Sequence, residues 1–133
     1  RGSFMFMAAL VRELHLLVEI EFMTTSSYGS GMTTNHDVRI TKDIESDIRD
    51  RDVLIVEDII DSGLTMQKLL ASLETYKPAK VIIAALLVKP EKLKVALNIH
   101  HCCFKIPNDF ILGYGLDYDG EGRNLPNIYT VTE

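Results

Sequence analysis

The sequence has no tryptophan, few cysteines and no long apolar segment. Among its 133 residues, the only cysteines are the neighbours Cys102 and Cys103. Adjacent cysteines rarely pair because the ring they would close is strained, so we expect two buried thiols on a strand and a reducing, cytoplasmic setting. No apolar run reaches the ~18 residues needed to cross a bilayer, so no membrane association is expected.

An excess of positive charge is also absent. The 14 lysines and arginines are outnumbered by 19 aspartates and glutamates, which gives a formal net charge of -5. This balance argues against general nucleic-acid binding, which depends on a basic surface. The composition, 47% hydrophobic and 25% charged, is that of one globular domain. Any phosphate would therefore have to be bound by backbone groups and a few local cations.

The hydrophobic pattern predicts an α/β fold with a mostly parallel twisted sheet flanked by helices. The unbroken apolar run 53–56 is typical of a strand buried on both faces of a parallel sheet, and helical periodicity follows it. A second apolar strand comes next, which completes a strand–helix–strand unit. The predicted elements are a helix over 4–17, a strand over 18–23, a mobile loop over 24–37, a returning strand over 38–41, a helix over 65–76, and strands over 53–56, 81–88, 99–104, 110–114 and 128–131.

The most informative segment joins the first apolar strand to the following helix. Glu57 and Asp58 come directly after the strand, and a loop over 61–65 with one glycine opens the helix. Ligands of open α/β sheets bind beyond the carboxyl ends of the strands, and a helix N-terminus favours phosphate. Gly63 allows close backbone approach, while Ser62 and Thr65 offer hydroxyl donors. The same residues are also common helix caps without any ligand, so the residues alone predict an anion site and leave capping open.

The two adjacent carboxylates are expected to bind different groups at this site. Along an extended backbone Glu57 and Asp58 point to opposite sides, so they can address different groups, such as ribose hydroxyls and a hydrated Mg²⁺. The segment is not a Walker loop, because no G-x-x-x-x-G-K-[ST] pattern occurs.

The stretch V-L-I-V-E-D-I-I-D-S-G-L-T-M over 53–66 resembles the signature of type I phosphoribosyltransferases that binds phosphoribosyl pyrophosphate (PRPP), in its bacterial hypoxanthine-guanine branch. Further blocks are similar to other parts of that family, in family order and over nearly the whole chain: residues 1–7, 22–29, 86–90, 106–118 and 123–126. The resemblance implies a single phosphoribosyltransferase domain over 1–133 with a small C-terminal hood over 105–126. Family members usually carry further residues before the first block, so the domain is expected to be N-terminally incomplete.

The resemblance also implies how the sugar phosphate is held. Glu57 and Asp58 would bind the ribose hydroxyls, and Asp61 would act on purine N7 as general acid or base. The 5′-phosphate would lie against Ser62, Gly63, Thr65 and the backbone of Leu64. Pyrophosphate would be bound by Arg1, Gly2 and Arg123, with Mg²⁺ held by Asp117, Glu57 and Asp58.

The purine would be recognised by Lys89, Phe110 and Ile111. Lysine donates hydrogen bonds and accepts none, so Lys89 would favour a 6-oxo group and reject the amino group of adenine. Without the resemblance, Lys89 reads as a strand-end lysine and Phe110 as core. Ser27 and Tyr28 would lie on a loop that closes over the reacting centre.

The implied activity is transfer of a phosphoribosyl group from PRPP to hypoxanthine or guanine, which gives IMP or GMP and pyrophosphate in purine salvage. A homodimer or homotetramer is the usual assembly. Two alternatives stay open: a non-catalytic regulator of the same fold that binds PRPP or nucleotide, and an inactive truncated product. A zinc site at 100–103 is disfavoured, because four consecutive ligands on a strand cannot converge on one tetrahedral ion.

Overall fold

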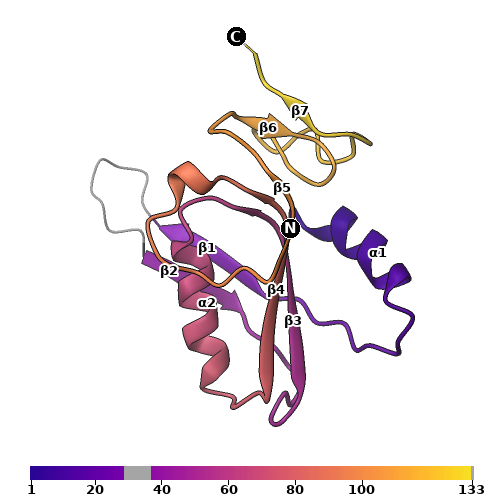
Figure 1. Ribbon diagram of the computed structural model, residues 1–133, viewed down its shortest axis with the longest axis vertical. Coiled ribbons are helices and arrows are strands. Elements are labelled where there is room, and N and C mark those ends of the chain that lie inside the picture. The colour runs from indigo at the N-terminus through magenta and orange to yellow at the C-terminus, as the bar shows by residue number, and fades with distance from the viewer. Residues whose placement is uncertain (29–36, 133) are drawn as a thin grey trace.

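The computed structural model describes residues 1–28 and 37–132. Figure 1 shows a central sheet with a helix on either side and a small C-terminal unit beyond one end of the strands. Within the described ranges, no helix is long and apolar enough to span a membrane. The elements are α1 (Phe4–Glu13), β1 (Thr24–Tyr28), β2 (Asp37–Lys42), β3 (Asp52–Ile60), α2 (Leu64–Glu74), β4 (Lys80–Val88), η1 (Pro90–Lys92), β5 (His101–Lys105), β6 (Ile111–Leu112) and β7 (Tyr129–Thr130).

The central sheet is parallel and has the strand order β3-β4-β5. Its longest pairing runs from Asp52↔Lys80 to Ile60↔Val88, with α2 as the connection between β3 and β4. The predicted strand–helix–strand unit and the α/β class are therefore confirmed. Because the strands are parallel, their carboxyl ends meet at one edge of the sheet, next to the start of α2 and beneath β6 and β7 (Figure 1).

Two apolar clusters hold the layers together, and β4 contributes to both. On one side, Ile83 and Ala85 pack with Leu73 and other apolar residues of α2. On the other side, Leu86 and Leu87 pack with Phe6 of α1 and with Leu116. The apolar residues of α2 recur with helical spacing, so they form one face of the helix, and this face covers the sheet. These contacts fix the loop between β3 and α2 at the sheet edge.

Two predictions about the first 23 residues are wrong. The helix expected over 4–17 ends at Glu13, and Leu16 and Leu17 after it are exposed, so the apolar period continues past the surface that α1 packs against. The strand expected over 18–23 is absent: the segment is extended, but Val18 and Phe22 are exposed. A strand needs a neighbouring backbone for its N–H and C=O groups, and no strand of the described ranges pairs with this segment.

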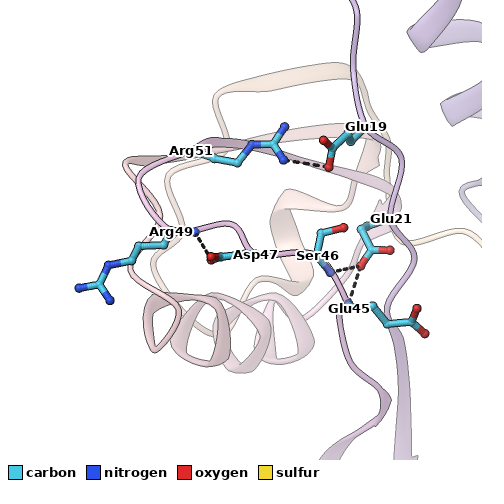
Figure 2. Close-up of polar contacts among 7 residues, drawn as sticks. All are labelled: Glu19, Glu21, Glu45, Ser46, Asp47, Arg49 and Arg51. Carbon is cyan, nitrogen blue, oxygen red and sulfur yellow. Dashed lines mark hydrogen bonds and ion pairs between the residues drawn. The ribbon is translucent and has the colours of Figure 1, made fainter.

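Polar side chains hold the extended segment against residues 45–51 instead (Figure 2). Arg51 Nη1 lies 2.8 Å from Glu19 Oε2. The Glu21 carboxylate accepts backbone N–H groups of Glu45 at 2.6 Å and Ser46 at 3.2 Å, and these hydrogen bonds lower the pKa of Glu21. Glu19 and Glu21, whose alternation with apolar residues predicted a solvent-exposed strand face, therefore bind residues 45–51.

The loop expected over 24–37 is partly a hairpin. Its first residues form β1, which pairs antiparallel with β2, with Thr25 opposite Ile40. The predicted return of the chain at 38–41 is thus confirmed, while the middle of the predicted loop, residues 29–36, lies outside the described residues. Ser27 and Tyr28 belong to β1 by their backbone. The prediction missed β1 because its run of serines and threonines gave no hydrophobic alternation.

Strand β3 is longer and more exposed than predicted. It extends to Ile60, so Glu57 and Asp58 lie within the strand and do not follow it. Leu54 is 38% exposed, because β3 is an edge strand of the three-stranded sheet. At the opposite edge, Cys103 is exposed and Cys102 only partly buried, which corrects the expectation of two buried thiols.

Candidate functional site

The loop between β3 and α2 is built around a glycine that no other residue replaces without strain. Gly63 caps α2 with φ +83°, in the left-handed region. A side-chain carbon at this position would also lie 2.9 Å from Leu97 Cδ1 and 3.0 Å from Val95 Cγ2. The Leu64 N–H donates to Ser62 Oγ at 3.3 Å, which shapes the turn into the helix. The loop therefore lies close to the segment 93–97, and α2 begins at the carboxyl ends of the strands.

The two adjacent carboxylates differ in their surroundings. Glu57 Oε1 accepts the N–H of Asp58 at 3.2 Å, and Asp58 Oδ1 accepts the N–H of Ile59 at 2.8 Å. Burial, together with the neighbouring Asp58 carboxyl, raises the pKa of Glu57 to about 8. At neutral pH Glu57 therefore carries a proton and is a hydrogen-bond donor as well as an acceptor. Such a group suits sugar hydroxyls, and a bound cation would favour its ionised form.

Two lysines approach the loop from the segment after β4. Lys89 is only 6% exposed, and its N–H donates to the Ile60 carbonyl at 3.0 Å. Lys92, in η1, places Nζ 3.2 Å from Asp61. A lysine with so little exposed surface is uncommon, because the charged group is rarely buried without a partner. Sequence reasoning selected Lys89 and Asp61 but missed Lys92, which no motif singled out.

The first residues of the chain lie against Asp58 and the turn at 115–123. A side chain at Gly2 would collide with Asp58 Oδ2, and one at Gly115 would collide with the Gly2 carbonyl. Arg123 donates to the Gly115 carbonyl at 2.8 Å and pairs with Asp117 at 3.0 Å. Two of the predicted pyrophosphate residues, Gly2 and Arg123, therefore lie close to two predicted metal residues, Asp58 and Asp117, although they are far apart in the sequence.

Phe110 is exposed, which contradicts the alternative that it is a core residue. It is 55% exposed and meets Tyr118 edge to face, with ring centroids 5.4 Å apart. Ile111 begins β6, which pairs with β7. An exposed aromatic ring held by a second ring provides a flat surface on which a planar ligand can stack.

A cleft of about 530 Å³ runs along β3 between α2 and the extended segment near Met23. Its lining includes four of the predicted site residues: Arg1, Glu57, Thr65 and Arg123. The predicted purine residues and Asp61 do not line this cleft. The structure thus brings one predicted ribose residue, one phosphate residue and two pyrophosphate residues to the same cavity.

The carboxylates are suitable donors for a magnesium ion, although the described residues contain no cluster of three His, Cys, Asp or Glu side chains arranged around a metal. Magnesium takes one or two protein carboxylates and completes its shell with water and phosphate oxygens, so such a cluster is not required. Asp117 already binds Arg123 and the Gly120 N–H. Glu57 lines the cavity, Asp58 lies against Gly2, and both carry carboxylate oxygens of the type that magnesium prefers.

The comparisons with known proteins agree with this arrangement. The sequence model of the phosphoribosyl transferase domain matches residues 1–119. Hypoxanthine phosphoribosyltransferase of Haemophilus influenzae is 57% identical over 128 residues, which are 96% of this chain and 72% of that protein. Hypoxanthine-guanine phosphoribosyltransferase of Aquifex aeolicus is 42% identical over 133 residues, covering 100% of this chain and 75% of that protein.

The solved structures give the same answer for the fold. The crystal structure of a hypoxanthine-guanine phosphoribosyltransferase from Bacillus anthracis, with a HEPES molecule in the active site, superposes with a TM-score of 0.94 at 43% identity. The match covers 99% of this chain and 78% of that one. The resemblance inferred from the sequence is confirmed: the chain belongs to the phosphoribosyl transferase domain family and has the fold of its hypoxanthine-guanine members.

Proposed function

We propose that the protein transfers the phosphoribosyl group of PRPP to N9 of hypoxanthine or guanine in purine salvage. The C1′–O bond to pyrophosphate breaks, the C1′–N9 bond forms, and the purine loses one proton. The observation that carries the proposal is the glycine-capped loop at Gly63, which lies between Asp61 and the start of α2 and is covered by the segment that bears Lys89. The names of the relatives support the same reaction.

The 5′-phosphate is assigned to the loop that opens α2. Ser62 and Thr65 supply hydroxyl donors, Gly63 permits close approach, and the N–H groups from Leu64 onward carry the partial positive charge of a helix N-terminus. Glu57 and Asp58 are assigned to the ribose hydroxyls. A Glu57 that is protonated in the free protein can donate one hydrogen bond and accept another, which suits a diol.

Pyrophosphate is assigned to Arg1, the backbone at Gly2, and Arg123. Arg1 and Arg123 line the same cleft as Glu57. Magnesium, held by Asp117 with Glu57 or Asp58, would neutralise charge on the leaving pyrophosphate. The protein's own contribution is to hold the sugar and the base in line, because positioning supplies a large part of the rate in reactions between two bound substrates.

The purine is assigned to the surface beside the cleft. Phe110 offers its exposed ring for stacking, and Ile111 offers its main chain. Lys89 donates to the 6-oxo group, and Asp61 takes the proton as charge develops on the ring. In this proposal residues 105–126 are the hood over the base, and residues 1–133 belong to one catalytic domain. Ser27 and Tyr28, at the end of β1, are assigned to closure over the reacting centre.

Three further assignments rest on the family and on cysteine usage. We expect PRPP, hypoxanthine or guanine, IMP or GMP, and pyrophosphate as ligands. We expect a homodimer or homotetramer. A cytoplasmic location follows from two free thiols in a chain without a disulfide framework.

The test is a PRPP- and Mg²⁺-dependent assay with hypoxanthine, guanine, xanthine and adenine measured side by side. We expect nucleotide formation with the 6-oxo purines and little or none with adenine. Binding of PRPP without its consumption would identify a non-catalytic regulator and refute the proposed reaction. A chain that shows no cooperative unfolding, and no stabilisation by GMP, would be an inactive product.

A further inference from the structure

The segment that follows β4 is fastened over the loop before α2 by contacts of its backbone. The Lys89 N–H donates to the Ile60 carbonyl at 3.0 Å, and the Lys94 N–H donates to the Ser62 carbonyl at 2.9 Å. These two bonds lie on either side of Asp61 in the loop and of η1 in the segment. The loop 60–62 and the segment 89–94 are therefore fastened together, and η1 is held next to Asp61.

One side chain of η1 completes this unit. Lys92 Nζ lies 3.2 Å from both carboxylate oxygens of Asp61 and donates a hydrogen bond to Oδ2. Oδ1 is buried and has no hydrogen-bond donor among the described residues. The ammonium group is thus equally close to both oxygens. Among the described residues, Lys92 is the ion-pair partner of Asp61.

The pair is too exposed to be explained by its contribution to folding. The side chains of Lys92 and Asp61 are 41% and 44% exposed. Ion pairs of this kind are screened by solvent and add little to stability. Their geometry still matters, because a cation that bridges both oxygens fixes the rotation of the carboxylate. A proton acceptor is effective only when one oxygen faces the proton that it removes.

We propose that Lys92 is a positioning residue that orients the Asp61 carboxylate for proton transfer from the purine. The inference rests on the proposed function, because it concerns the step assigned to Asp61. Lys92 lies three residues after Lys89, with Pro90 between them restricting the backbone. The lysine that reads the purine and the lysine that aligns Asp61 therefore belong to one short, rigid span. A purine bound at Lys89 would meet a carboxylate whose rotation Lys92 already restricts.

Steady-state kinetics of Lys92→Met test the inference. We expect kcat to fall about tenfold while KM for PRPP changes less than about twofold, because the orientation of the acceptor is lost and the phosphate loop is untouched. Lys92→Arg keeps the charge and the donors and should recover most of kcat. Lys80→Met removes an equal charge from the exposed start of β4, at the opposite end of the sheet, and should behave as wild type.

A double-mutant cycle separates positioning from a general effect on the fold. In the Asp61→Asn background, Lys92→Met should lower kcat by less than about twofold, because the group that Lys92 orients no longer accepts a proton. Equal losses in both backgrounds would show that Lys92 does not act through Asp61 and would overturn the inference. Unchanged kcat in Lys92→Met alone would overturn it as well.

The proposed function and the inference fail in different ways. A folded wild-type protein that consumes no PRPP refutes the proposed function. The inference falls with it, because the step assigned to Asp61 does not then take place. An active wild-type protein whose kcat is unchanged by Lys92→Met leaves the proposed function standing and overturns the inference alone.

Discussion

The protonated state of Glu57 predicts an unusual dependence of stability on pH. Glu57 is an acid whose pKa in the folded protein is about 8, against an ordinary value of 4.5. Below pH 4.5 the folded and unfolded chains both hold the proton. As the pH rises, the unfolded chain releases it while the folded chain retains it, so the free energy of unfolding falls. The fall ends near pH 8, where the folded protein also ionises.

The size of the effect follows from the same two values. At about 1.4 kcal/mol for each pKa unit, the interval from 4.5 to about 8 corresponds to an upper limit of about 5 kcal/mol. The Asp58 N–H, which donates to Glu57, favours the charged form, and the side chain borders a cleft that water can enter. We therefore expect a loss of about 2 to 3 kcal/mol between pH 5 and pH 8.

Glu57→Gln removes the titration and retains an oxygen that can accept the Asp58 N–H. Urea unfolding in metal-free buffer, followed by circular dichroism from pH 5 to pH 9, gives the free energy of unfolding of both proteins. The free energy of unfolding of the variant should rise relative to that of the wild type as the pH rises. Glu74→Gln, at an exposed position of α2, is the matched control and should keep the wild-type slope. A difference between wild type and Glu57→Gln that does not change with pH would refute the reasoning.

Three further predictions concern the loop, the core and the purine. Gly63→Ala should cost about 1 to 2 kcal/mol of stability through its positive φ, and should raise KM for PRPP; an unchanged melting temperature and KM would contradict this. Leu87→Ala should cost about 2 to 5 kcal/mol in urea unfolding, against less than about 1 kcal/mol for the half-exposed Leu54→Ala, and equal costs would mean that the core is wrongly placed. Lys89→Ala should weaken discrimination between hypoxanthine and adenine about tenfold in competition assays, and an unchanged preference would remove Lys89 from purine recognition.

The elements that could be predicted are those whose pattern reflects burial. The runs at 53–56 and 81–88 and the helical spacing between them are long, apolar and regular, and the structure contains β3, β4 and α2 at these places. The segment 18–23 has an equally regular alternation but no paired backbone beside it. A strand forms only where two stretches of backbone lie side by side. The alternation within one stretch does not show whether a partner stretch lies beside it.

The candidate site was predictable to the extent that its residues share a motif. Glu57, Asp58 and the loop to Thr65 are contiguous, and these residues predict an anion site even without the resemblance. Arg123 and Asp117 lie about 60 residues away and were assigned through the resemblance alone. Neither the motif nor the resemblance indicates Lys92, because its contact with Asp61 forms across the fold and no spacing in the sequence predicts it.

Because Lys89 is almost fully buried, chemical modification of its amine can test the purine site that we propose around it. Reagents that acylate amines attack exposed lysines such as Lys80 first and should reach Lys89, which is 6% exposed, much later. Occupancy of the site by a purine nucleotide should slow that late reaction further. Peptide mass spectrometry can therefore follow ligand binding at this one side chain without any label designed into the protein.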